Sequence, residues 1–144
     1  MSKKRSRAAD IGGLNISIQT IPHNRHRYPT CGDYWATENW SRQQIRVSEM
    51  GDWRYETLVA IHELVEQSLC RAAGIPEADI AAFDKQFEAE KEMGQHVQYD
   101  EPGMHPQALY HSQHCAAMGV EMLVAVLLGV NWSDYCRRID QLWP

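Results

Sequence analysis

Residues 58–70 read LVAIHELVEQSLC, and this stretch decides both the fold and the candidate site. At about 100° per residue, its side chains divide between two sides of a helix. The apolar side holds Leu58, Ala60, Ile61, Leu64, Val65 and Leu69, and the polar side holds His62, Glu63, Glu66 and Gln67. The pattern predicts an amphipathic helix that buries its apolar side.

His62 and Glu66 lie one turn apart on the polar side, so an imidazole and a carboxylate can reach the same ion. Glu63 lies about 100° further round the helix, beside this pair. The alternative is a solvated polar face. Against it, Val59 and Cys70 lie within the polar side, and neither Lys nor Arg occurs between Tyr55 and Cys70. The polar side is therefore a candidate metal site.

A second predicted helix of the same kind, residues 107–128, can supply further ligands. Besides Tyr110 and Cys115, its ionisable side chains after Ala108 are His111, His114 and Glu121, which fall within about 80° of one another on a helical wheel. Carboxylate and imidazole groups on so apolar a helix are costly unless they are paired or bind a metal. Two alternatives stay open, in which Glu121 pairs with a core arginine and His111 is a surface residue.

Packing the two helices side by side is expected to join their polar edges. His62, Glu66 and His114 then make a two-histidine, one-carboxylate set, which is the ligand set of catalytic zinc sites with an open position. Glu121 is expected to be a ligand or to orient one, and His111 is a further candidate. Glu63 is placed to act as a general base.

These residues resemble the zincin-type metallopeptidases, which carry His-Glu-x-x-His on a helix after a strand that edges the site. His62 matches the first ligand, Glu63 matches the base, and Glu66 stands where the family has its second histidine. The resemblance covers residues 45–121. It implies that Ile45–Ser48 is the edge strand and that His114 is the third ligand. The carboxylate at Glu66 could favour Mn²⁺ or Fe²⁺ over Zn²⁺. The chain also looks like small proteins encoded by phages and prophages.

The rest of the sequence predicts an α+β fold of strands followed by helices. Alternating apolar and polar residues predict strands at 15–21 and 45–48, and an aromatic run predicts a third at 33–37. Together they suggest a small antiparallel sheet of two or three strands. Helices are expected at 53–73, 77–93, 107–128 and 132–142, and the first is bounded by an N-cap at Asp52 and by Gly74. Residues 1–13 are expected to be a flexible basic tail and residues 14–144 a single domain.

Composition excludes several classes of protein. The net charge of −5 argues against a dedicated nucleic-acid binder. The longest apolar stretch, 118–130, contains Glu121 and is too short to span a bilayer. The four cysteines have no metal-binding or disulfide spacing. We expect a cytoplasmic protein of a bacterium or a phage-infected host.

The leading hypothesis is a metal-dependent hydrolase, with zinc as the first metal and a peptide or small molecule as its substrate. A second hypothesis is a structural metal site in a phage accessory or binding protein. A third is a Mg²⁺-dependent nucleotide hydrolase that uses Glu63, Glu66, Asp84 and Glu88 as its acidic set. The sequence does not predict the oligomeric state.

Overall fold

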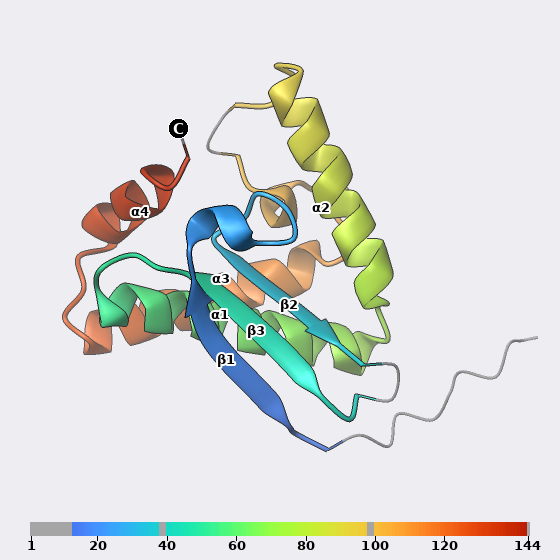
Figure 1. The fold of residues 1–144 in the computed structure, drawn as a ribbon, viewed down its shortest axis with the longest axis horizontal. Coiled ribbons are helices and arrows are strands. Elements are labelled where there is room, and N and C mark those ends of the chain that lie inside the picture. Colours follow the sequence, from blue (N-terminus) through green and yellow to red (C-terminus); the bar gives the residue numbers. More distant parts are fainter. Residues whose placement is uncertain (1–12, 38–39, 98–99, 144) are drawn as a thin grey trace, which may run out of the picture.

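The fold is α+β, as predicted. The computed structural model describes residues 13–37, 40–97 and 100–143. The elements are strands β1 (Ile16–Ile21), β2 (Gly32–Ala36) and β3 (Gln43–Ser48), and helices α1 (Trp53–Ala73), α2 (Glu77–Glu92), α3 (His111–Leu127) and α4 (Trp132–Asp140), with short 3₁₀ turns η1 (His23–Arg25) and η2 (Pro102–Met104) (Figure 1). Apart from Gly13, the predicted basic tail lies outside the described residues.

The sheet is mixed, so the prediction of an antiparallel sheet is wrong. Its order is β1-β3-β2, with β1 parallel and β2 antiparallel to β3. Alternation shows which residues face the core but says nothing about strand direction. The short connection between β2 and β3 makes that pair antiparallel, whereas the ten residues between β1 and β2 let β3 insert between them. Ile45–Ser48 therefore belongs to the central strand and is not the edge strand.

The central strand supplies the apolar layer on which the helices pack. Ile45 and Val47 have no exposed surface, while Gln44 and Arg46 on the other face are half-buried. Helix α1 packs against β2 and β3, and α3 packs along α1. Figure 1 shows both helices behind the sheet. The layers are thus sheet, α1 and α3, and the α1–α3 contact holds the candidate site.

Helix α1 begins and ends where its capping residues predict. The Asp52 carboxylate accepts a hydrogen bond from the backbone N–H of Arg54 at 2.9 Å. At the other end Gly74 has a φ of 69°, in the left-handed region that favours glycine, and the N–H of Ile75 donates to the carbonyl of Cys70. The predicted bounds, 53–73, are confirmed.

The orientation of α1 differs from the prediction, because its polar side is the buried one. The buried residues of the helix are Leu58, Val59, His62, Glu63, Glu66, Gln67 and Cys70. Leu69, assigned to the apolar side, is 38% exposed, whereas Glu66 is only 5% exposed. Helical periodicity separates the two sides but does not state which one faces the protein when the buried side binds polar partners.

The remaining helices differ from the predictions mainly at their ends. α3 begins at His111 and not at residue 107, because the preceding residues form turns after η2. α4 ends at Asp140, two residues earlier than predicted. Among the described residues, none of the helices is long and apolar enough to cross a bilayer.

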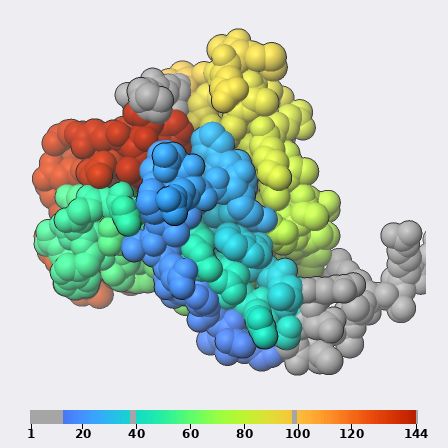
Figure 2. Space-filling view, viewed as in Figure 1, coloured from blue at the N-terminus to red at the C-terminus, as the bar shows by residue number. Residues whose placement is uncertain are grey.

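The segment between β1 and β2 lies over the helical layer on the face shown in Figure 2. In that view this segment (blue) separates α4 (red) from α2 (yellow-green). Its last residues, Tyr28–Cys31, line a cavity that also reaches the polar side of α1. The β1–β2 connection therefore forms one wall of the candidate site.

The reversed orientation of α1 gives a direct test. Val59→Ala should lower the free energy of unfolding by about 1–3 kcal/mol, because Val59 lies on the polar side of the helical wheel and is 2% exposed in the core. Leu69→Ala, on the apolar side of the helical wheel, should cost less than about 1 kcal/mol because its side chain is partly in water. Urea unfolding of the two variants checks this, and equal losses would contradict the observed orientation.

Candidate metal centre

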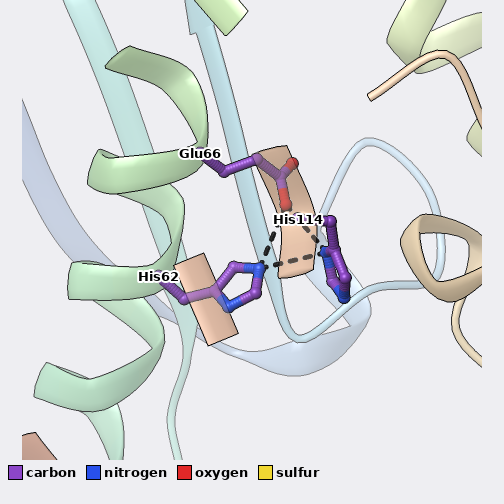
Figure 3. Close-up of side chains that lie close together, drawn as sticks. All are labelled: His62, Glu66 and His114. Carbon is purple, nitrogen blue, oxygen red and sulfur yellow. Dashed lines mark hydrogen bonds and ion pairs between the residues drawn. The ribbon is translucent and has the colours of Figure 1, made fainter. Parts of the chain in front are cut away.

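Three side chains from α1 and α3 bring one donor atom each to a common point (Figure 3). Glu66 Oε2 lies 3.0 Å from His62 Nε2 and 2.8 Å from His114 Nδ1, and the two nitrogens are 3.2 Å apart. All three residues are buried. In the parts of the chain that the structure describes, this is the only group of three or more such side chains whose donor atoms converge in this way. These are three of the predicted ligands.

The triangle of donor atoms has nearly the size that a tetrahedral ion requires. Zinc binds His nitrogen and carboxylate oxygen at about 2.0–2.2 Å, which places neighbouring ligands of a tetrahedron about 3.3 Å apart or slightly more. The three distances, 2.8, 3.0 and 3.2 Å, are shorter by a few tenths of an ångström. A small outward movement of these side chains would therefore accommodate an ion.

The second nitrogen of His62 is fixed by a carboxylate. Nδ1–H donates to Glu121 Oε1 at 2.7 Å, which leaves Nε2 as the nitrogen that can bind a metal ion. Glu121 in turn accepts from the Tyr135 hydroxyl at 2.5 Å through its other oxygen. Carboxylates that orient metal-binding histidines in this way also raise their basicity. Of the two roles predicted for Glu121, the geometry favours orienting His62, and among the described residues its hydrogen-bond partners are His62 and Tyr135, not the core arginine of the alternative.

His114 and Glu66 have outer partners of the same kind. His114 Nε2–H donates to Glu101 Oε2 at 3.2 Å, and the Tyr34 hydroxyl donates to Glu66 Oε1 at 3.0 Å. The site residues predicted from the sequence did not include Glu101, Tyr34 or Tyr135. Glu101 lies in an acidic loop next to a helix with two histidines, which was the one available signal.

Without a metal ion, burial and these hydrogen bonds set the charges of the three converging side chains. Burial lowers the pKa of His62, but hydrogen bonds to Glu121 and Glu66 outweigh this and raise it to about 11. Burial likewise lowers the pKa of His114, and its bonds to Glu101 and Glu66 raise it to about 9. Burial raises the pKa of Glu66, but both histidines lower it to about 2. A metal ion must therefore displace protons from the imidazoles.

Two glycines allow the backbone to approach the site closely. A Cβ at Gly103 would lie 2.4 Å from Cγ and Nδ1 of His114. A Cβ at Gly32 would lie 2.6 Å from Glu63 Oε1 and 2.7 Å from Val59 Cγ1. Because Cβ atoms do not occur this close to other heavy atoms, only glycine fits without movement of the site residues. The backbones of η2 and β2 thus form walls of the site.

Glu63 lies in the same cavity, which has a volume of about 220 Å³. Its residue is 9% exposed, and within the described ranges its carboxylate makes no hydrogen bond. Burial raises its pKa well above the ordinary value, and the charge of Glu66 raises it further. A raised pKa makes a carboxylate a stronger base whenever it is ionised.

His111, the remaining predicted ligand candidate, lies outside the donor triangle. It does not belong to the converging group, and its Nδ1–H donates to the carbonyl of Gly103, in the wall of the site, at 2.9 Å. In the loop that precedes α3, Asp100 accepts from the N–H of Val97, and His105 Nδ1 accepts from the N–H of Gln107. From this loop it is Glu101 that reaches the site.

The acidic set of the nucleotide-hydrolase hypothesis lines the cavity but does not converge. Asp84 accepts from the hydroxyls of Tyr110 and Tyr28, and Glu88 lies 3.2 Å from Lys91 Nζ. Their oxygens already have partners of their own. The geometry thus favours the histidine-containing triangle over an all-carboxylate magnesium site.

Comparison with known proteins adds no further information about this site. No family model, no curated protein and no solved structure matches the chain.

The triangle predicts the metal content of the purified protein. After reconstitution, mass spectrometry should find about one equivalent of a divalent transition metal in the wild type and less than about a tenth of this in His62→Ala and His114→Ala, since each variant removes one of three ligands. His111→Ala is the matched control and should keep the metal. Absence of metal from the wild type, or its retention in His114→Ala, would contradict the assignment.

The raised pKa of Asp84 predicts that the stability of the protein depends on pH. Burial raises its pKa from 3.8 to about 7, so between these values the folded state holds more protons than the unfolded state and stability falls as pH rises. Asp84→Asn removes this charge. From pH 5 to pH 8 the stability of the variant relative to the wild type should rise by on the order of 1–3 kcal/mol, as measured by urea unfolding. Parallel pH profiles would show that Asp84 does not titrate in this way.

Proposed function

We propose that this chain is a metal-dependent hydrolase in which His62, Glu66 and His114 hold one divalent metal ion. The observation that carries the proposal is the donor triangle with Glu63 unpaired beside it in the same cavity. Two imidazoles and one carboxylate make three protein ligands, the number found in catalytic zinc sites, whereas structural sites have four. The missing fourth ligand leaves a coordination position for water or substrate.

Zinc is the first candidate metal, with Mn²⁺ and Fe²⁺ as alternatives. Imidazole ligands suit all three ions, and the single carboxylate adds a hard oxygen ligand that Mn²⁺ and Fe²⁺ also accept. A soft thiolate ligand is absent from the converging group among the described residues. When bound, such an ion supplies Lewis-acid chemistry: it polarises a substrate oxygen and makes water more acidic.

The side chains around the metal site have separate roles in proton transfer and in positioning the ligands. Glu63 takes a proton from the attacking water, and burial, by raising the pKa of Glu63, makes its carboxylate a stronger base. Glu121 and Glu101 hold the two imidazoles in the tautomers that direct Nε2 of His62 and Nδ1 of His114 towards the triangle. Tyr34 fixes the position of Glu66. Each of these residues acts from a backbone element packed against α1 or α3.

The substrate class we propose is a peptide or a small amide or ester. The zincin resemblance supports a peptide, because in that family a strand edges the site. Here the strand beside Glu63 is β2, which is an edge strand of the sheet and contacts α1 through Gly32. The cavity volume of about 220 Å³ is below that of most drug-sized ligand sites, so it suits one residue of a chain and not a whole cofactor.

A structural metal site in an accessory or binding protein is the competing proposal. It requires that the fold depends on the ion, since structural sites contribute directly to folding. The three-ligand geometry and the unpaired Glu63 favour the catalytic role. Retention of the circular dichroism spectrum after chelation would support the hydrolase, and unfolding on chelation would support the structural site.

Glu63 provides the decisive experiment. Glu63→Gln should keep the metal and reduce turnover of a peptide and ester panel by at least about a hundredfold, because general-base catalysis contributes 10²–10⁴-fold. Glu49→Gln, at an exposed position outside the cavity, is the matched control and should keep full activity. Lack of turnover by the metal-loaded wild type, or equal turnover by Glu63→Gln, would contradict the proposal.

A further inference from the structure

Helix α3 has an apolar surface on the side that faces away from α1. Its buried residues are His114, Ala117, Glu121 and Ala125. On the opposite side lie Val120, Met122, Leu123, Val126 and Leu127, with exposed fractions of 38, 46, 62, 74 and 77%. The helix is therefore polar towards the protein and apolar towards solvent, the reverse of an ordinary surface helix.

This surface contains no charged side chain. Within 111–127 the one carboxylate is Glu121, which is buried and bonded to His62, and there is no Lys or Arg. The small residues Cys115, Ala116 and Gly119 are also exposed, so another backbone can come close. Ala116, Val120, Leu123 and Leu127 recur at spacings of four, three and four residues, the heptad spacing by which two helices pack together.

The exposed area is large enough for a specific contact. The five large apolar side chains expose roughly 500 Å² of surface, near the upper limit for the largest patch of a monomeric protein. Two such surfaces in contact would bury about 1,000 Å², which is the lower limit for a biological interface. With α3 about 25 Å long, the contact would extend over its whole length.

We propose that α3 pairs with α3 of a second copy of this chain, forming a two-fold symmetric dimer. An uncharged helix buries no unpaired charge against itself, so the surface is complementary to its own copy. It carries no charge that would select a partner of different composition. The contact lies on the side of α3 opposite His114 and Glu121, so it leaves the metal site accessible. This proposal does not depend on the proposed hydrolase activity.

Light scattering after size-exclusion chromatography tests the dimer on the full chain. The wild type should have a mass of about 33 kDa, twice the chain mass of 16.6 kDa. Leu123→Glu should weaken the dimer on the order of a hundredfold or more and give the monomer mass, because it buries two like charges in the contact. Val126→Glu, at a second exposed position, should act in the same way. Far-UV circular dichroism should show both variants folded.

Met93→Glu is the matched control, since Met93 is 67% exposed at the end of α2 and should leave the dimer unchanged. A monomeric wild type would overturn the proposal, including one that binds lipid vesicles through this surface. A dimer that persists in folded Leu123→Glu and Val126→Glu would overturn it as well, by placing the interface elsewhere.

Discussion

The structure depends on one constraint: ionisable groups buried between α1 and α3 must satisfy one another. His62, Glu66, His114 and Glu121 are each at most 7% exposed, and an isolated charge in such a place would be strongly unfavourable. Each makes two or more hydrogen bonds within the network. Because the network connects residues 62 and 66 to residues 114 and 121, it fixes how α3 lies along α1. The other elements then pack around a helix pair whose register is set by polar contacts.

This constraint explains features that hydrophobic packing alone would not produce. α1 turns its histidine and glutamates inwards and leaves Leu69 partly in water, and α3 does the same with Leu123 and Leu127. The sheet meets α1 at Gly32, where the lack of a side chain gives Glu63 its space. The same reason places polar residues inside and apolar residues outside on both α1 and α3. On each helix the histidine and glutamate side chains of the site lie on one side, and that side is the buried one. The outward apolar surface of α3 is a consequence of the site.

Local signals in the sequence predicted the elements well, and the reason is physical. Asp52 and Gly74 end α1 through backbone hydrogen bonds that depend only on neighbouring residues. Three other features depend on contacts between distant segments, which periodicity does not encode. They are the strand direction, the burial of the polar side of α1 and the role of Glu101. The three ligand candidates His62, Glu66 and His114 were predictable because imidazoles and carboxylates on apolar helices require partners. Glu101 was not, because an acidic residue in a loop is ordinarily solvated.

The charges of the network also bear on whether the site is structural or catalytic. With pKa values raised to about 11 and about 9, His62 and His114 carry protons at neutral pH and donate hydrogen bonds to the carboxylates around them without a metal ion. The protein can therefore fold with these side chains already in place, unlike a zinc finger, whose ligands converge only when the metal binds. A divalent ion that binds here would exchange with these protons in a preformed site. If an ion binds, this preorganisation would lower the conformational part of the cost of binding, while the protons of both imidazoles would still have to be displaced, and the three ligands would leave a coordination position beside Glu63.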